Sequence, residues 1–226
     1  AAAAGPVAPA VEVEWETVEV EETVAAVETV GVDEAIEVVE VAVVQEFAQI
    51  DRTPVRRRMQ DPGAVTLILL VRDIDAAFAR LAAAGATIVT TGGAPVTPSP
   101  TSKTRAVIVE DPDGHFVELA QLVPPPATDA PASSNVIGIR FRVTVSDIER
   151  TAQFYRDHLG VAATPGPFTR SPGVMAMMGL PDTVEYRVTM TQVPGSTLIL
   201  EFLDLKGIDR AVVPARIQDP GAYRLQ

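Results

Sequence analysis

The stretch Val145–Gly160 reads VSDIERTAQFYRDHLG, and it decides the fold because it shows where a strand ends and a helix begins. Asp147 is suited to capping a helix N-terminus, and Glu149 adds an acidic side chain in the first turn. The glycine at the end is a typical helix stop. Alternating residues at Arg140–Val145 predict a strand before the helix. Apolar residues recur in the run at helical spacing, at Ile148, Ala152, Tyr155 and Leu159.

The same pattern occurs once more, earlier in the chain. An alternating strand at Thr66–Val71 leads through Asp73 into a helical run that stops at Gly85. We therefore predict helices at about Ile74–Ala84 and Ile148–Leu159. Three strand candidates follow each helix: Thr87–Thr91, Arg105–Glu110 and His115–Gln121 in the first copy, and Val161–Thr164, Val184–Gln192 and Thr197–Asp204 in the second.

A longer repeat divides the chain into units. Ile50–Ala64 recurs as Ile208–Ala222 at a constant offset of 158 residues, and ten of the fifteen positions are identical. The repeat predicts the end of a first unit, two complete βαβββ units and the start of a fourth, so that the source polypeptide should extend beyond residue 226. The predicted boundaries are 1–50 for the remnant of the first unit, 51–123 for the second unit, 124–134 for a Pro/Ala/Ser linker, 135–207 for the third unit and 208–226 for the start of a fourth.

Two signatures in this order resemble the vicinal-oxygen-chelate superfamily, which includes glyoxalases and bleomycin-resistance proteins. They are the Val145–Gly160 run and DPDGHFVEL at Asp111–Leu119. The resemblance covers about Ile50–Gln226 and implies an α+β fold of tandem βαβββ units whose mixed and antiparallel sheets form cups. It also implies a first cup from units one and two, and a second from units three and four. Such a cup typically holds a metal through a His on the first strand and a Glu on the last strand of each unit.

The expected carboxylates are present, whereas the expected histidines are not. Glu118 and Glu201 match the family's ligand glutamates and are the candidate catalytic residues. Counted back from the capping aspartates, Arg140 and Thr66 occupy the place of the histidines. Alternation turns Arg140, Arg142 and Thr144 into the cup. The predicted ligand-binding set is therefore Thr66, Arg140, Arg142, Thr144, Glu118 and Glu201.

These residues lead to specific expectations about partners of the two carboxylates. Arg140 should form a direct ion pair with Glu201, and Thr66 or water should contact Glu118, because a buried carboxylate without a partner is costly. No cofactor is expected, and a divalent metal would be the exception. The methionines at 175, 177, 178 and 190 either fill a core or line an adaptable apolar pocket.

Composition excludes several classes of partner. The net charge of −12 arises entirely in residues 1–50, which hold Asp33, eleven Glu and no Lys or Arg. The remaining 176 residues hold 18 acidic and 18 basic side chains, so nucleic acid is not expected as a partner. Residues 1–50 are either half-buried strands or a solvated acidic tail. No apolar stretch is long enough to predict a membrane span.

The sequence leaves the compartment and the activity open. Ala1–Ala10 is rich in Ala and Pro and could be the remnant of an export signal, but it has no basic region. The protein is therefore expected to be either cytoplasmic or exported. The missing histidines favour a metal-free protein that binds a small organic molecule. The alternatives are a diverged lyase or isomerase with Glu118 or Glu201 as base, and a structural or assembly protein. Self-association is expected, because an incomplete fourth unit would leave a cup edge uncovered.

Overall fold

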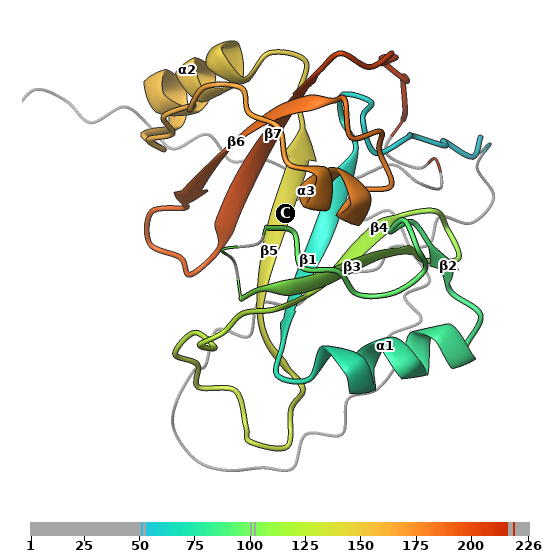
Figure 1. Ribbon diagram of the computed structural model, residues 1–226. Coiled ribbons are helices and arrows are strands. Elements are labelled where there is room, and N and C mark those ends of the chain that lie inside the picture. Colours follow the sequence, from blue (N-terminus) through green and yellow to red (C-terminus); the bar gives the residue numbers. More distant parts are fainter. Residues whose placement is uncertain (1–50, 52, 100, 102, 217–218, 220–226) are drawn as a thin grey trace, which may run out of the picture. The chain divides into compact units, whose positions relative to one another are not determined.

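The two helices predicted from the capping aspartates form as expected in the computed structural model, which describes residues 51, 53–99, 101, 103–216 and 219 (Figure 1). α1 spans Ile74–Ala83, and the Asp73 carboxylate accepts a hydrogen bond from the Ala76 amide. α2 spans Ile148–Leu159, and the Asp147 carboxylate accepts from two amides of the first turn. α2 ends at Gly160 in the left-handed conformation, with φ of 67°, which glycine adopts without steric cost.

Seven strands form one sheet in the order β2-β3-β4-β1-β5-β7-β6. Their order along the chain confirms the α+β fold with two successive strand–helix–strand units. The inner pairs β1·β4 and β5·β7 are parallel, and the other four are antiparallel. The strands are β1 (Val65–Val71), β2 (Thr87–Ile88), β3 (Arg105–Glu110), β4 (Phe116–Gln121), β5 (Val136–Thr144), β6 (Glu185–Gln192) and β7 (Ile199–Lys206).

One predicted strand, Val161–Thr164, is wrong. This segment lies beside β6, but its carbonyl groups accept hydrogen bonds from side chains instead of from a backbone ladder. The Thr191 hydroxyl donates to the Ala162 carbonyl at 2.6 Å, and the Thr189 hydroxyl donates to the Thr164 carbonyl at 3.0 Å. Pro165 follows directly and has no amide hydrogen to continue a ladder. The third unit therefore has three strands among its described residues instead of four.

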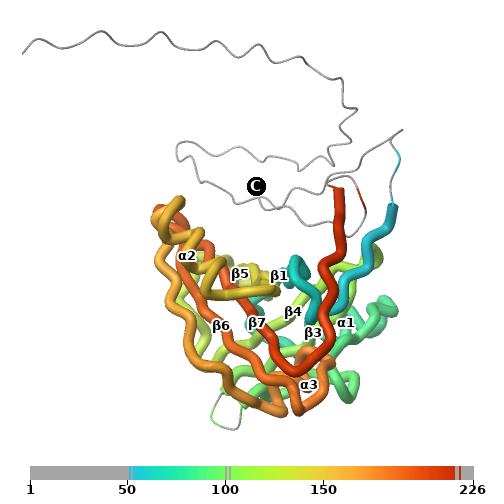
Figure 2. The backbone as a smooth tube through the Cα atoms, turned by 90° about the horizontal axis from the view of Figure 1, so that it is seen from above, coloured from blue at the N-terminus to red at the C-terminus, as the bar shows by residue number. Residues whose placement is uncertain are grey.

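The second and third units share a single sheet. This corrects the expectation of one cup from units one and two and another from units three and four. β1 and β5 are the first strands of the two units, and they pair antiparallel from Val65↔Val143 to Val71↔Val136. Each first strand has its own unit's last strand on the other side. Because β1 and β5 pair with each other, neither unit has an unpaired strand edge at the centre of the sheet. Figure 2 shows the resulting arc of strands, from β6 through β5 and β1 to β3.

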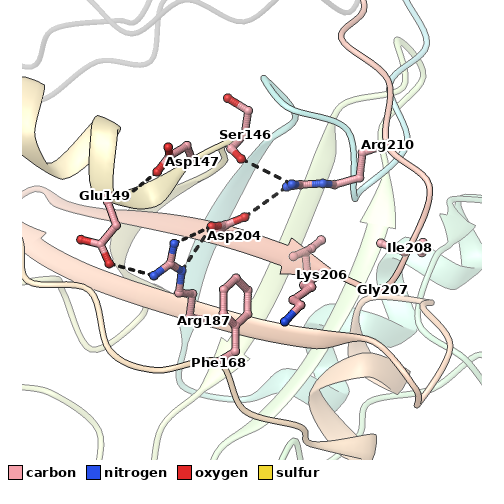
Figure 3. Close-up of a pocket in the computed structure, with 11 residues that line it drawn as sticks. Ser146, Asp147, Glu149, Phe168, Arg187, Asp204, Lys206, Gly207, Ile208 and Arg210 are labelled. Carbon is pink, nitrogen blue, oxygen red and sulfur yellow. Dashed lines mark hydrogen bonds and ion pairs between the residues drawn. The ribbon is translucent and has the colours of Figure 1, made fainter.

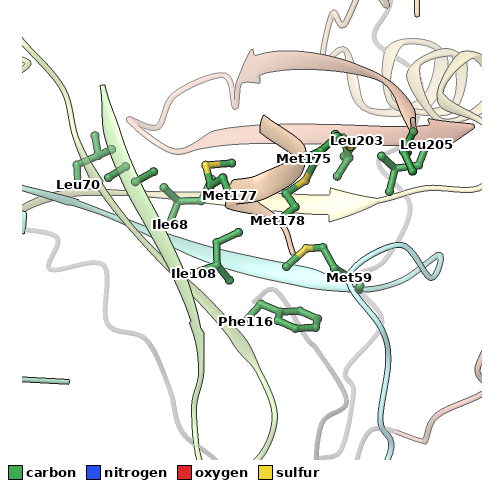
Figure 4. Packing of buried hydrophobic residues seen from close by; sticks show 14 of the residues in the cluster. Met59, Ile68, Leu70, Ile108, Phe116, Met175, Met177, Met178, Leu203 and Leu205 are labelled. Carbon is green, nitrogen blue, oxygen red and sulfur yellow. The ribbon is translucent and has the colours of Figure 1, made fainter. Parts of the chain in front are cut away.

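The two faces of the sheet are covered differently. On one face α1 packs on β1, β3 and β4 through Ile74, and α2 packs on β5 and β7 through Ile148, both fully buried. On the other, concave face lies a short helix that the sequence did not predict, α3 (Pro172–Met177). Its methionines join the largest core cluster, and Figure 4 shows them against Ile68 and Leu203. Among the described residues, no helix combines the length and apolar character needed to cross a bilayer.

The two copies of the 158-residue repeat hold each other in a reciprocal latch, formed by residues 53–63 and 209–219. Within the copies, Arg58 donates to Asp61 and Arg216 donates to Asp219 in the same way. Across the copies, the Ala211 amide donates to Asp61 at 2.8 Å, and the Thr53 amide donates to Asp219 at 2.9 Å. Each aspartate therefore joins its own loop to the other one. The predicted start of a fourth unit lies mostly outside the described residues and remains a prediction.

Replacing Asp61 with alanine should destabilise the protein by about 3 kcal/mol, since the Ala211 amide and the Arg58 backbone amide lose their acceptor inside the structure. The Asp61 side chain is only 2% exposed. Burial alone would raise its pKa, but the hydrogen bonds from Arg58 and Ala211 outweigh burial and lower the pKa to about 2. Because the folded pKa lies below the unfolded value, this stabilisation is complete above about pH 4 and disappears as the pH falls towards 2.

Urea unfolding of wild type and Asp61→Ala between pH 7 and pH 2.5 measures both effects. The difference in unfolding free energy should be largest at neutral pH and shrink on acidification. Asp209→Ala is the matched control, because its carboxylate contacts the same Arg58 but its side chain is 89% exposed. Equal effects of the two substitutions would contradict the latch as a source of stability.

Candidate functional site

The concave face of the sheet carries a small cluster of charged side chains at the centre of an otherwise mainly apolar surface. Strand alternation places Glu118 of β4, Arg140 and Arg142 of β5, and Glu201 of β7 on this face. Strand β4 lies directly beside β1, and strand β7 lies directly beside β5, so the two flank the central pair β1·β5. The site is therefore built from both units, and each unit contributes one glutamate.

Arg142 bridges the two glutamates. Its Nη1 atom donates to Glu118 Oε2 at 2.6 Å, its Nε atom donates to Glu201 Oε2 at 3.0 Å, and its Nη2 atom lies 2.8 Å from the same oxygen. The three side chains are 12%, 5% and 6% exposed, so this ion triad is almost dry. All three nitrogens of one guanidinium are thus used by two carboxylates. Such charge-assisted hydrogen bonds are short and fix the side chains in a single geometry.

The strand register shows which first-strand residues lie opposite the glutamates. Arg142 is paired with Glu201 across β5 and β7, and Ile68 is paired with Glu118 across β1 and β4. Arg140 and Thr66, which match the family's histidine positions, lie two residues earlier in their strands. Counting back from a capping aspartate cannot fix the register, because a shift of two residues keeps every side chain on the same face.

The predicted pairing of Arg140 with Glu201 is confirmed, but it is the longer of two contacts to that carboxylate. Arg140 Nη1 lies 3.6 Å from Glu201 Oε1, beyond hydrogen-bond distance. The expectation that Thr66 or water would serve Glu118 is wrong, since Arg142 contacts it directly. Arg142 had been assigned only to the cup-facing set. The presence of a second Arg on the same strand face was the one signal in the sequence for its role.

Thr66 and Thr144 are cup-facing, but their hydroxyl groups contact Met59 and not the charged side chains. The Thr144 hydroxyl donates to the Met59 carbonyl at 2.9 Å, and the Thr66 hydroxyl lies 3.8 Å from the Met59 sulfur. Both residues are 2% exposed, and Thr66 is paired with Arg142 across β1 and β5. Of the six predicted ligand-binding residues, four are therefore joined by ion pairs, whereas the two threonines contact Met59.

Burial determines the electrostatics of the triad. It raises the pKa of Glu118, and the opposing attraction of Arg142 does not fully compensate. Burial also disfavours the charged form of Arg142, but Glu118 and Glu201 outweigh it and raise the pKa of the guanidinium, which stays protonated. The pKa of Glu118 is thus moved towards the range of a general base.

A cavity of about 290 Å³ lies next to the triad. Glu118, Arg140, Arg142 and Glu201 line one part of it, and most other lining side chains are apolar. Val188 and Met190 of β6 are 36% and 57% exposed, so an apolar wall is open to a ligand. The apolar lining comes from both units and from α3, and includes Ile68, Leu70, Ala106, Ala120, Val174, Met177, Met178 and Leu203.

A larger and more open pocket, of about 540 Å³, lies near the start of α2 and surrounds Asp204 of β7 (Figure 3). Asp204 is buried and accepts hydrogen bonds from Arg187 and Arg210. Arg187 also bonds to Glu149, and its guanidinium lies 4.5 Å from the Phe168 ring centre. Because the two arginines are already paired, the cluster ties α2, β6 and β7 together, and we regard it as structural.

Comparison with known proteins is consistent with this architecture. Residues 13–119 match the family model described as Glyoxalase/Bleomycin resistance protein/Dioxygenase superfamily. Residues 13–50 of this match lie outside the described part of the chain. No curated protein sequence matches significantly.

Several solved structures match part of the chain. Glyoxalase I from Zea mays is 21% identical with a TM-score of 0.42, over 63% of this chain and 43% of that one. A glyoxalase/bleomycin resistance protein/dioxygenase superfamily member from Vibrio splendidus 12B01 is 16% identical with a TM-score of 0.38, over 63% and 97% of the two chains. Methylmalonyl-CoA epimerase from Mycobacterium tuberculosis is 14% identical with a TM-score of 0.41, over 62% and 85%. The chain thus covers less than half of the maize enzyme.

Proposed function

We propose that this chain, whose residues 13–119 match the model of the Glyoxalase/Bleomycin resistance protein/Dioxygenase superfamily, binds a small organic molecule in the cavity between its second and third units without a divalent metal. One observation carries the proposal. The Arg142 guanidinium fills the space between Glu118 and Glu201, with contacts of 2.6 and 2.8 Å. A guanidinium in this place takes over the neutralisation of two carboxylates that a cation would otherwise provide.

The donor set around the cavity does not fit a divalent metal. The residues opposite the two glutamates are Ile68 and Arg142, neither of which can coordinate a cation. His115 pairs with Asp111 beside the β3–β4 turn, and His158 contacts Phe154 on α2, so both imidazoles lie outside the cavity lining. Within the described residues, no three His, Cys, Asp or Glu side chains are grouped so that they could hold a metal ion.

The cavity has the character of a small-molecule site. Its volume of about 290 Å³ is near the lower end of the range of roughly 300–1,000 Å³ that is typical of ligand pockets. Apolar walls with a few fixed polar groups are the usual composition of such pockets. Exposed Val188 and Met190 are otherwise unfavourable on the surface of a folded protein. Both observations support binding of an apolar or amphipathic molecule.

Binding of the neutral fluorescent probe N-phenyl-1-naphthylamine tests the proposal. The probe should bind the full chain with one-site stoichiometry, and excess EDTA should leave its affinity unchanged. Ala120→Leu, which adds three carbons to a cavity-lining side chain on β4, should weaken binding roughly tenfold by filling the site. Ala132→Leu, in the linker between the units, is the control and should bind the probe as wild type does. Loss of binding in EDTA, or equal binding by Ala120→Leu, would contradict the proposal.

A second candidate is a lyase or isomerase with Glu118 as general base. The raised pKa of Glu118 favours it, because a carboxyl group with a higher pKa is a stronger base near neutral pH. The neighbouring arginines could stabilise an enolate formed by removal of a proton next to a carbonyl group. Binding that survives in Glu118→Gln while turnover is lost would favour this candidate. Self-association and the lack of nucleic-acid binding remain predictions from the sequence.

A further inference from the structure

We propose that the ligand of this cavity carries an acidic group, and that Arg140 binds it. This inference rests on the function proposed above and specifies its ligand as an organic acid with an apolar body. It follows from the different situations of the two arginines on the cavity side of β5. They are two residues apart, face the same way and line the same cavity. Only Arg142, however, is hydrogen-bonded to the glutamates.

Arg142 is held in place by both glutamates. Its Nη1 and Nε atoms donate to Glu118 and Glu201 at 2.6 and 3.0 Å, and its Nη2 atom lies 2.8 Å from Glu201 Oε2. Its side chain is 12% exposed. Releasing it for a ligand would leave two buried carboxylates without a partner, which is strongly unfavourable. The role of Arg142 is therefore to neutralise the floor of the cavity.

Arg140, by contrast, has a guanidinium nitrogen without a partner in the described structure. Only Nη1 approaches a carboxylate, at 3.6 Å from Glu201 Oε1. The Nε atom is buried and has no hydrogen-bond partner within the part of the chain that the structure describes. The Nε and Nη2 hydrogens of an arginine point in parallel and form the fork that matches a carboxylate, sulfonate or phosphate. A buried N–H without an acceptor is costly unless a ligand satisfies it.

The contacts of the glutamates favour an anion over a cation. Arg142 pairs with both glutamates and Arg140 lies beside Glu201, so the two guanidinium charges balance the two carboxylate charges. A cationic ligand would have to compete with two guanidinium groups for these carboxylates, whereas an anion at Arg140 meets a donor without a partner in the described structure. The apolar wall opposite, with exposed Met190 and Val188, then determines that the rest of the molecule is apolar.

A pair of probes that differ only in an acidic group tests this inference. 8-Anilinonaphthalene-1-sulfonate is N-phenyl-1-naphthylamine with a sulfonate added, and both fluoresce on entering an apolar site. Affinities are measured on the full chain for wild type, Arg140→Gln, Arg140→Lys and Arg170→Gln. Arg170 is the matched control, because its side chain is 62% exposed, pairs with Glu185 and does not line the cavity.

Arg140→Gln should weaken binding of the sulfonate probe about tenfold or more and change binding of the neutral probe less than about twofold. Arg140→Lys should restore part of the sulfonate affinity, and Arg170→Gln should leave both affinities unchanged. If both probes bind wild type and Arg140→Gln affects them equally or not at all, the acidic-ligand inference is wrong while the proposed binding function stands. If Arg170→Gln weakens the sulfonate probe as much as Arg140→Gln does, general surface charge explains the effect and the inference is again wrong. If neither probe binds wild type, the proposed function itself is contradicted.

Discussion

Replacing Arg142 with alanine should destabilise the protein by about 4 kcal/mol, because Glu118 would remain buried without a partner and Glu201 would keep only its 3.6 Å contact to Arg140. Glu118 and Glu201 are 5% and 6% exposed, and Arg142 supplies the only hydrogen bonds that the described structure gives their side chains. In the variant the pKa of both carboxyl groups should be well above the unfolded value. Their contribution to stability is then most favourable at low pH and is lost as the pH rises through the folded pKa. Urea unfolding at pH 4.5 and pH 7.5 measures this difference.

Two further variants separate the charge effect from lost packing. Adding Glu118→Gln and Glu201→Gln to Arg142→Ala should recover much of the stability at pH 7.5, since the buried groups become neutral. Arg140→Ala should cost less than Arg142→Ala, because its contact to Glu201 is 3.6 Å long and its side chain is 22% exposed. A loss for Arg142→Ala that is the same at both pH values and is not rescued would sink the explanation by buried charge.

Gly179→Ala should destabilise the protein by about 3 kcal/mol for two separate reasons. Gly179 has φ of +66°, which costs a non-glycine residue roughly 1–2 kcal/mol. An added Cβ would also lie 2.5 Å from the Val89 carbonyl oxygen, so the backbone of the second unit would have to move away from the end of α3. Gly195→Ala is the matched control, since its φ is +76° and a Cβ there would meet nothing within 4 Å. It should cost only about 1 kcal/mol.

The difference between the two glycine variants isolates the close approach of α3 to the second unit. Met177 and Met178 at the end of α3 line the cavity, so Gly179→Ala should also weaken binding of N-phenyl-1-naphthylamine, whereas Gly195→Ala should not. Thermal unfolding and probe titration of both variants provide the two measurements. Equal stability losses would mean that the contact with Val89 contributes nothing beyond backbone strain.

Local signals made most of the fold predictable. The helices could be placed from Asp73 and Asp147 because a capping side chain bonds to amides two or three residues away. Five of the predicted strands differ from the observed ones by at most two residues at either end, because alternation and turn residues are also local. Both glutamates of the site could be named from the motifs that contain them.

Features that depend on distant residues could not be predicted in the same way. α3 has only six residues, and its stability comes from burying Met175 and Met177 against strands of both units. The role of Arg142 depends on the register of β5 against β7. A register shifted by two residues would fit the same sequence pattern, so the pattern does not determine it. The pairing of β1 with β5 is a choice between strand edges, and each edge looks equally suitable from its own sequence.

The reciprocal latch has a consequence for how the protein opens. The Thr53 amide and Asp219 are 166 residues apart, and the Ala211 amide and Asp61 are 150 apart, so the two cross-bonds close nearly the whole described chain into a ring without a covalent bond. Because each aspartate is bonded to both loops, detaching one loop also removes a hydrogen-bond donor from the other loop's aspartate. The two loops therefore cannot detach independently. A proteolytic cut or a destabilising change in one loop is expected to loosen the other, so that the latch couples the segment before β1 and the segment after β7 into one cooperative opening event.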